Sequence, residues 1–334
     1  MCQRNPVQCI IPPYITDELC KSPDPAVRSR AIAQLRNATR MRAFREAAQF
    51  TPLLMAAAAP NMKRNRLVYD AKQSDQLPGT LVRSEGQPKT GDKAADEAFD
   101  GAGDTYDFYD KIFSRNSLDD NGMTLISTVH VKEVDDDGQL VPMNNAFWNG
   151  EQMAYGDGDD RIFRRFTASL DVIGHELTHG VVTFTSNLRY FAQSGALNEH
   201  FADVFGILVT HWKQDVTASK AKWVLGTEIM VPLPASAPSS AKRRGIRDME
   251  NPGTAFVNDP DLGNDPQPAH MSKLFTGPRD RQGVHINSGI PNRAFVLAAK
   301  AIGGRTWDTA GRIWYKTLQQ LTRESQFIDC AKIS

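Results

Sequence analysis

Residues 170–184 read Leu-Asp-Val-Ile-Gly-His-Glu-Leu-Thr-His-Gly-Val-Val-Thr-Phe, with apolar positions that recur at helical spacing. This periodicity predicts a helix. Positions i and i+4 of a helix point the same way, about 5–6 Å apart, so His175 and His179 can grip one metal ion. Glu176 stands one position round, close enough to act on a metal-bound water without binding the metal. Taken alone, the pattern also fits two surface histidines on a helix.

A second helical pattern supplies an acidic side chain for the same site. Glu199 and Asp203 are separated by one helical turn, so both lie on one face of that helix. Glu199 completes a His-His-Glu set that leaves one coordination position open, as catalytic zinc requires. Asp203 can hold a ligating imidazole through its second nitrogen. The sequence therefore predicts one catalytic zinc ion, Zn²⁺, bound by His175, His179 and Glu199, although Glu199 by itself also fits a solvated helix charge.

The composition excludes several classes of protein. Of the 334 residues, 40% are hydrophobic and 23% are charged, as in ordinary globular proteins of roughly two domains. The 39 basic and 39 acidic residues balance, so no net charge attracts nucleic acid or an anionic membrane. No apolar run reaches the ~18 residues of a membrane span, and no secretory leader is visible. We therefore expect no nucleic-acid or membrane partner, and a chain that is cytoplasmic or exported without a signal peptide.

Local patterns divide the chain into three parts. Residues 25–48 follow Asp24, a helix-capping side chain, and predict a helix whose arginine-rich face suits solvent or a partner better than nucleic acid. The proline-bounded stretch 51–60 predicts a linker. Alternating β-branched residues at 124–131 favour a strand, whereas helical spacing prevails from residue 168 onward. The expected fold class is α+β, with the zinc cleft between two lobes. The three parts are a short helical region (1–60), a β-rich N-terminal lobe ending in the zinc helix (61–190) and an all-α C-terminal lobe (191–334).

The two helical motifs also carry a family resemblance. His175-Glu-Leu-Thr-His179, followed by Asn198-Glu-x-x-x-Asp203, resembles the motifs of the thermolysin family of zinc metallopeptidases. The resemblance covers roughly residues 66–330 and includes Asn144-Asn-Ala-Phe-Trp-Asn-Gly150 and His285-Ile-Asn-Ser-Gly289. It implies a zinc-dependent neutral endopeptidase in which Glu176 is the general base.

The same resemblance implies roles for further residues. Two would stabilise the oxyanion of the reaction and a third would orient one of them: His285, Tyr190 and Asp280. Three would hold the backbone of a polypeptide substrate: Asn145, Ala146 and Arg247. Three apolar residues would line the pocket for the residue after the cut: Phe163, Val172 and Ile246. Such a pocket favours cleavage on the amino side of Leu, Phe or Ile.

The N-terminal region resembles the protealysin-like branch of this family, whose members carry a short propeptide. The resemblance rests on Ile11-Pro-Pro-Tyr14 and on the brevity of the region. It implies a zymogen, in which the chain's own propeptide near residues 1–60 shields the site until it is removed by processing in the linker. A thiolate of Cys2 or Cys9 could ligate the zinc, since zinc accepts sulfur, although ordinary reduced thiols are the favoured interpretation.

The sequence departs from the family pattern in two places. Asp171 matches one ligand of the family's double calcium site, whereas the other positions hold Thr210, Lys222, Val224 and Thr227. Calcium needs several carboxylate oxygens, so we expect no double calcium site. The chain also stops before the family's last helices, which predicts an uncovered apolar surface. A catalytically weak zinc-binding interaction protein is therefore the alternative function.

Overall fold

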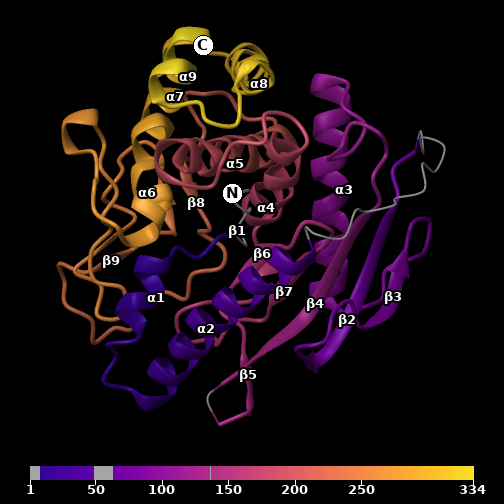
Figure 1. Ribbon diagram of the computed structural model, residues 1–334, viewed down its shortest axis with the longest axis vertical. Helices are drawn as coiled ribbons and strands as arrows, with labels where there is room; N and C mark the ends of the chain where they lie inside the picture. The colour runs from indigo at the N-terminus through magenta and orange to yellow at the C-terminus, as the bar shows by residue number, and fades with distance from the viewer. Residues whose placement is uncertain (1–7, 49–62, 136) are drawn as a thin grey trace.

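The computed structural model describes residues 8–48, 63–135 and 137–334 (Figure 1). Cys2 and the predicted linker at 51–60 lie outside these residues. The ribbon has a sheet-containing lobe and a helical lobe, which confirms the α+β class. Within the described residues, no helix is long and apolar enough to cross a membrane.

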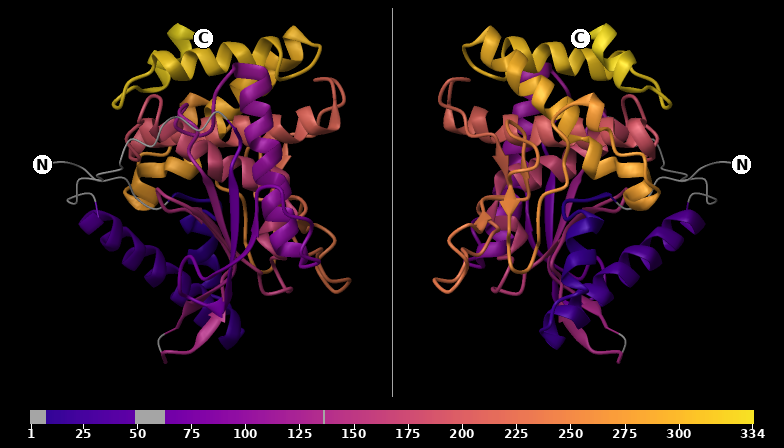
Figure 2. Two further views of the ribbon diagram at one scale, coloured as in Figure 1. Left: turned by 90° about the vertical axis from the view of Figure 1, so that its right-hand side faces the viewer. Right: turned by 90° about the vertical axis from the view of Figure 1, so that its left-hand side faces the viewer.

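The first described elements are β1 (Gln8–Cys9), α1 (Pro13–Leu19) and α2 (Pro25–Ala48). The predicted helix over 25–48 is thus confirmed by α2. It begins where expected because the Asp24 carboxylate accepts a hydrogen bond from the Ala26 N–H at 2.8 Å. Figure 2 shows α2 beside the sheet-containing lobe, at the opposite end of the molecule from the C-terminal helices.

The sheet-containing lobe is built on a seven-stranded sheet of described residues, in the order β1-β6-β7-β4-β2-β3 with β5 beside β4. Its other strands are β2 (Arg66–Ser74), β3 (Thr80–Ser84), β4 (Leu125–Val134), β5 (Leu140–Pro142), β6 (Ala146–Trp148) and β7 (Met153–Gly156). The central strand β4 contains most of the predicted strand 124–131. It runs parallel to β2 and β7, and β6 runs antiparallel to β7. Strand β1 pairs antiparallel with the side of β6 that faces away from β7.

Helix α3 (Lys93–Phe113) connects the sheet to the helical lobe, because it contacts β2, β4 and α4. The Asp92 side chain caps its first turn by accepting a hydrogen bond from the Ala95 N–H at 2.8 Å. Ser114 follows the last helical residue, and its φ of 56° lies in the left-handed region typical of the residue after a helix. Figure 1 shows α3 standing beside the strands and reaching the level of α4.

The second lobe is formed mainly by helices. Helix α4 (Leu170–Thr183) lies where the two lobes meet, because it contacts both β6 and α5. The helices of the second lobe are α5 (Ala192–Gln214), α6 (Arg279–Asn287), α7 (Gly289–Ile302), α8 (Thr309–Gln320) and α9 (Phe327–Ile333). The segment between α5 and α6 adds two short antiparallel pairs, β8 (Val224–Leu225) with β10 (Arg247–Asp248) and β9 (Lys242–Arg243) with β11 (Phe256–Val257). The predicted all-α lobe therefore also contains short extended segments, which place Arg247 next to α5.

Glycines allow α4 and α5 to touch at their backbones. A Cβ atom built on Gly174 would lie 3.1 Å from the Cα of Gly206. A Cβ on Gly206 would lie 2.6 Å from the Asp171 carbonyl oxygen and 2.8 Å from the His175 nitrogen. Both distances are too short for a side chain, so this close approach requires glycine. It also fixes the position of His175 relative to the acidic face of α5.

We expect Gly206→Ala to lower the free energy of unfolding by about 1–3 kcal/mol, because the added methyl group must push backbone away. The higher helix propensity of alanine, about 1 kcal/mol, offsets only part of this cost. Gly311→Ala in α8 is the matched control, since its nearest neighbour is the movable Leu208 side chain at 3.2 Å. Chemical denaturation of both variants measures the difference, and equal stabilities would contradict the proposed backbone contact.

Candidate active site

Helices α4 and α5 bring the three predicted metal ligands together. The Nε2 atoms of His175 and His179 are 3.0 Å apart. Glu199 places one carboxylate oxygen 3.6 Å from the Nε2 of His175 and the other 3.5 Å from that of His179. All three side chains are fully buried, and one ligand atom from each lies within 4.8 Å of the others. The Glu199 Oε2 accepts no hydrogen bond from the residues that the structure describes. Two imidazoles and an unsatisfied buried carboxylate fit a zinc ion.

Close polar contacts orient both histidines toward this cluster. The Nδ1 of His175 lies 2.8 Å from the Asp203 Oδ1, and the Nδ1 of His179 lies 2.8 Å from the Asn198 Oδ1. Each outer nitrogen is therefore the protonated one, and each Nε2 is left as a free electron-pair donor. Burial, followed by the neighbouring His175, holds the pKa of His179 well below its usual range, which favours the neutral form that binds metal.

Asp203 is shared between the histidine and a buried arginine. The Arg247 Nε and Nη2 donate to its carboxylate at 2.9 and 2.7 Å, and Asn292 donates from its Nδ2 at 2.8 Å. Burial opposes ionisation of Asp203, but Arg247 and His175 together outweigh it and lower the pKa of that carboxyl. Sequence reasoning missed the contributions of Asn198 and Asn292, because an asparagine has no distinctive spacing until its partner is known.

The Glu176 side chain contacts the backbone of strand β6. Its Oε2 accepts a hydrogen bond from the Trp148 N–H at 3.1 Å. The side chain is fully buried; burial and then Glu199 raise the pKa of Glu176, while the amides of Trp148 and Ile10 act in the opposite direction. The carboxylate therefore stands between the ligand cluster and the backbone of the cleft edge.

A tyrosine and a histidine also approach the ligand cluster, and both lie next to Glu199. The Tyr190 hydroxyl contacts Glu199 and lies 3.0 Å from the His285 Nε2. The His285 Nδ1 lies 2.7 Å from the Asp280 Oδ1. Burial alone would lower the pKa of His285, but the Glu199 and Asp280 carboxylates outweigh it and raise that pKa. Both predicted oxyanion donors thus point at the metal cluster.

The backbone before His285 makes this contact possible. Asp280, Arg281, Gln282 and Gly283 have φ angles of 52°, 50°, 63° and 81°, a left-handed turn. The turn folds Asp280 back so that its Oδ2 also accepts the His285 N–H at 2.8 Å. Non-glycine residues adopt such angles rarely and cluster at functional sites when they do.

The predicted substrate-binding residues contact the N-terminal segment of the same chain. The Ile10 N–H donates to the Ala146 carbonyl oxygen at 3.3 Å, and the Ile11 N–H donates to the Asn145 Oδ1 at 3.2 Å. Arg247 donates from its Nη1 to the Ile10 carbonyl oxygen at 3.1 Å. The predicted pocket residues are fully buried in the apolar cluster that contains Ile10: Phe163, Val172 and Ile246.

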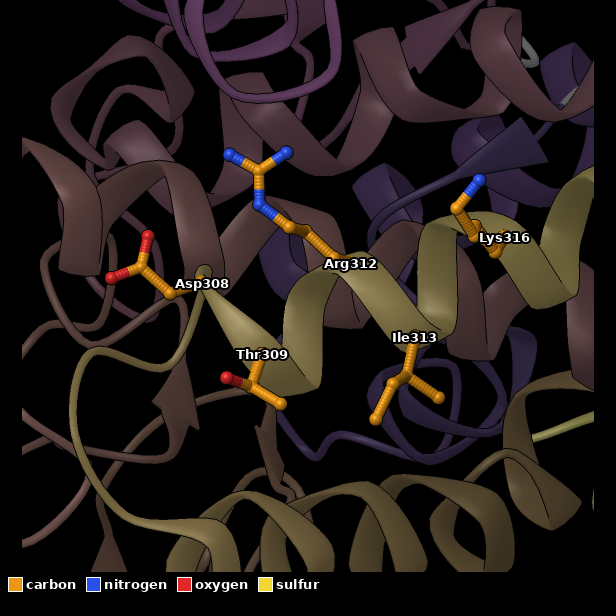
Figure 3. A pocket seen from close by; sticks show the side chains of 5 residues that line it. All are labelled: Asp308, Thr309, Arg312, Ile313 and Lys316. Atoms are coloured by element: carbon orange, nitrogen blue, oxygen red, sulfur yellow. The ribbon is translucent and has the colours of Figure 1, made fainter.

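Cys9 lies close to the site but outside the ligand cluster. Its Sγ lies 3.9 Å from the Ile11 carbonyl oxygen. Among the residues that the structure describes, the group of side chains able to bind one metal ion consists of His175, His179 and Glu199. Figure 3 shows a pocket on α8 lined by Asp308, Thr309, Arg312, Ile313 and Lys316. None of these lining residues belongs to the candidate active site.

Comparisons with known proteins agree with this arrangement. Residues 56–183 match the thermolysin metallopeptidase catalytic domain, and residues 186–334 match its alpha-helical domain. An extracellular metalloprotease of Pectobacterium carotovorum subsp. carotovorum is 51% identical over 259 residues, 78% of this chain and 70% of that protein. Protease PrtS of Photorhabdus sp. (strain Az29) is 42% identical over 338 residues, 99% of this chain and 86% of that protein. The solved precursor of protealysin, a metalloproteinase from Serratia proteamaculans, superposes with a TM-score of 0.81 at 41% identity, covering 98% and 91% of the two chains.

The two lobes and the His-His-Glu cluster between them define a zinc metalloendopeptidase. The chain belongs to the thermolysin family of metallopeptidases, and within it to the protealysin-like branch.

Proposed function

We propose that this endopeptidase cleaves polypeptides on the amino side of bulky apolar residues and is held inactive by its own N-terminal region. One observation carries the proposal: the backbone of Ile10 and Ile11 binds Ala146, Asn145 and Arg247, the residues expected to hold a substrate. The burial of Ile10 in the apolar cluster supports a preference for an aliphatic or aromatic residue after the cut.

The proposed site residues divide the chemistry between them. Zinc held by His175, His179 and Glu199 would polarise the scissile carbonyl group and acidify a water molecule. Glu176 takes the proton from the attacking water and passes it to the leaving nitrogen. Its contact with the Trp148 N–H supports this role, because the contact holds the carboxylate beside the strand that binds substrate.

The remaining polar residues stabilise charge and hold the substrate. His285 and Tyr190 donate hydrogen bonds to the developing oxyanion, a contribution worth roughly 2.7–4 kcal/mol per donor in other enzymes of acyl transfer. Asp280 orients His285, and Asp203 orients His175. Asn145, Ala146 and Arg247 bind the substrate backbone, while Phe163, Val172 and Ile246 form the apolar pocket.

The proposal divides the chain into a propeptide (1–60), a β-rich domain (61–190) and a helical domain (191–334). The two family matches, at 56–183 and 186–334, support a division of the peptidase into two domains close to residue 190. The contacts of Ile10 and Ile11 in the cleft support polypeptide substrates and the chain's own propeptide as partners. The balanced charge supports the absence of a nucleic-acid or membrane partner. The description of the Pectobacterium relative as extracellular supports a site of action outside the cell. Comparing activity in the medium with activity in the cells tests that location.

We also propose that the enzyme has no double calcium site. The Ser169 hydroxyl lies 2.6 Å from the Asp171 Oδ1 and 2.9 Å from the Glu228 Oε2. Burial and then Glu228 raise the pKa of Asp171 to about 7. The pair supplies only two carboxylates, whereas a double calcium site needs several. Thr210 and Lys222, at two of the family's ligand positions, support the same interpretation.

Casein hydrolysis tests the function directly. After removal of the N-terminal region, the protein should digest casein, a zinc chelator should abolish the activity, and added Zn²⁺ but not Ca²⁺ should restore it. Peptides with a central Phe or Leu should be cut before that residue, whereas matched peptides with Asp there should remain intact. Bound zinc without cleavage of any of these substrates would favour the alternative, a zinc-binding interaction protein.

A further inference from the structure

The N-terminal segment crosses the cleft in one defined direction. Strand β1 pairs antiparallel with β6, with Gln8 opposite Trp148 and Cys9 opposite Phe147. The chain continues in the same direction along β6, where the Ile10 N–H donates to the Ala146 carbonyl oxygen at 3.3 Å. Strand β1 also contacts α4, the helix that carries Glu176. The segment is thus an extended peptide laid between the edge strand and the catalytic helix.

Contacts on the C-terminal side of Cys9 fix Ile10 as the residue that fills the pocket. Arg247 donates to the Ile10 carbonyl oxygen at 3.1 Å, and the Ile11 N–H donates to the Asn145 Oδ1 at 3.2 Å. The Ile10 side chain is fully buried and belongs to the same extended apolar core as Phe163, Val172 and Ile246. Under the proposed specificity, a residue in this pocket is the one that follows the bond to be cut.

The reacting groups lie next to this segment. The Glu176 Oε2 accepts a hydrogen bond at 3.1 Å from the N–H of Trp148, the residue opposite Gln8 in the pairing of β1 with β6. The Tyr190 hydroxyl contacts Glu199 and lies 3.0 Å from the His285 Nε2, so both oxyanion donors lie at the ligand cluster. The peptide bond before Ile10 therefore lies between two anchors, the strand pairing that ends at Cys9 and the Arg247 contact with the Ile10 carbonyl oxygen.

We propose that the enzyme hydrolyses its own Cys9–Ile10 peptide bond within the same molecule, because that bond occupies the reacting position of the cleft. The inference rests on the proposed function and names a substrate of that site. The water oxygen bonds to the Cys9 carbonyl carbon as the bond from that carbon to the Ile10 nitrogen breaks. Glu176 carries one proton of the water to the nitrogen, and the second follows, which leaves a carboxylate on Cys9 and an ammonium group on Ile10.

The cut would leave the rest of the segment in the cleft at first. Arg247 and Asn145 hold the backbone beyond the bond, and Ile10 stays in its apolar pocket. The new amine lies beside the buried Glu176, where a positive charge gains a carboxylate partner. The clipped protein should therefore remain inhibited until the segment leaves, so this cleavage precedes activity instead of coinciding with it.

The zinc-loaded full chain tests the proposal by mass spectrometry of its N-terminus over time. A fragment that begins at Ile10 should appear, and its first-order rate constant should not change when the protein is diluted. Glu176→Gln should stay intact at this bond. Ile10→Leu should still be cut, whereas Ile10→Asp should not, because a charge is excluded from the apolar pocket. An intact Cys9–Ile10 bond in protein that digests casein after activation would overturn the inference and leave the proposed function standing.

A synthetic peptide covering residues 5–18 provides a test that does not depend on how the variants fold. Activated enzyme should cut this peptide between its Cys and Ile residues, and a version with Asp in place of that Ile should resist. Cleavage at any other bond, or a rate constant for the full chain that rises with protein concentration, would overturn the assignment. A preparation inactive toward both casein and the peptide would overturn the proposed function together with this inference.

Discussion

Replacing Glu176 by glutamine is expected to lower kcat by roughly 10²- to 10⁴-fold, the range typical of a lost general acid–base group. Glutamine keeps the shape of the side chain and can still accept the Trp148 N–H, which lies 3.1 Å from the Glu176 Oε2. It cannot take a proton from water. Zinc should stay bound, because Glu176 is not among the three clustered ligand residues. Initial rates on a quenched peptide and the metal content of the same sample measure the two effects.

The matched control is Glu133→Gln. Glu133 is buried on β4, and burial raises its pKa to about 8, so at neutral pH it already resembles glutamine in charge and shape. Its replacement should leave kcat unchanged. If Glu176→Gln retained the kcat of the unaltered enzyme, Glu176 could not be the base; if the variant lost its zinc, Glu176 would support the metal and not only the proton transfer.

The metal cluster could be predicted from the sequence because its geometry is local. His175 and His179 are one turn apart on α4, and Glu199 and Asp203 are one turn apart on α5, so helical periodicity alone places each pair. The meeting of the two helices is less local, but the glycines that permit it, Gly174 and Gly206, lie within the same segments. The fold class followed in the same way from the spacing of apolar residues.

Other parts of the site depend on contacts that no spacing reveals. The binding of Ile10 by Ala146 and Arg247 joins segments far apart in the chain, so the sequence indicated a propeptide but not the bond that it presents. The left-handed turn at 280–283 contains three non-glycine residues, for which local propensity predicts other backbone angles. Side-chain contacts, here those of Asp280 with His285 five residues further on, accompany this conformation.

Replacing Asp203 by alanine is expected to reduce both stability and metal binding. The change leaves the Arg247 guanidinium fully buried without its carboxylate, which should lower the free energy of unfolding by about 3–5 kcal/mol. It also removes the acceptor 2.8 Å from the His175 Nδ1, which should weaken zinc binding about 10- to 100-fold. Chemical denaturation of the zinc-free protein and a competition titration with a zinc chelator measure the two losses separately.

A double variant, Asp203→Leu with Arg247→Met, separates the two causes. Removing both charges eliminates the unpaired guanidinium, so most of the lost stability should return, as apolar replacements of buried ion pairs often achieve. Zinc binding should stay weak, because leucine cannot hold the His175 imidazole in the tautomer that leaves its Nε2 free. Full recovery of zinc affinity in the double variant would mean that Asp203 acts on the metal only by neutralising Arg247. Recovery of stability without recovery of zinc affinity would identify the contact of Asp203 with His175 as its contribution to the metal site.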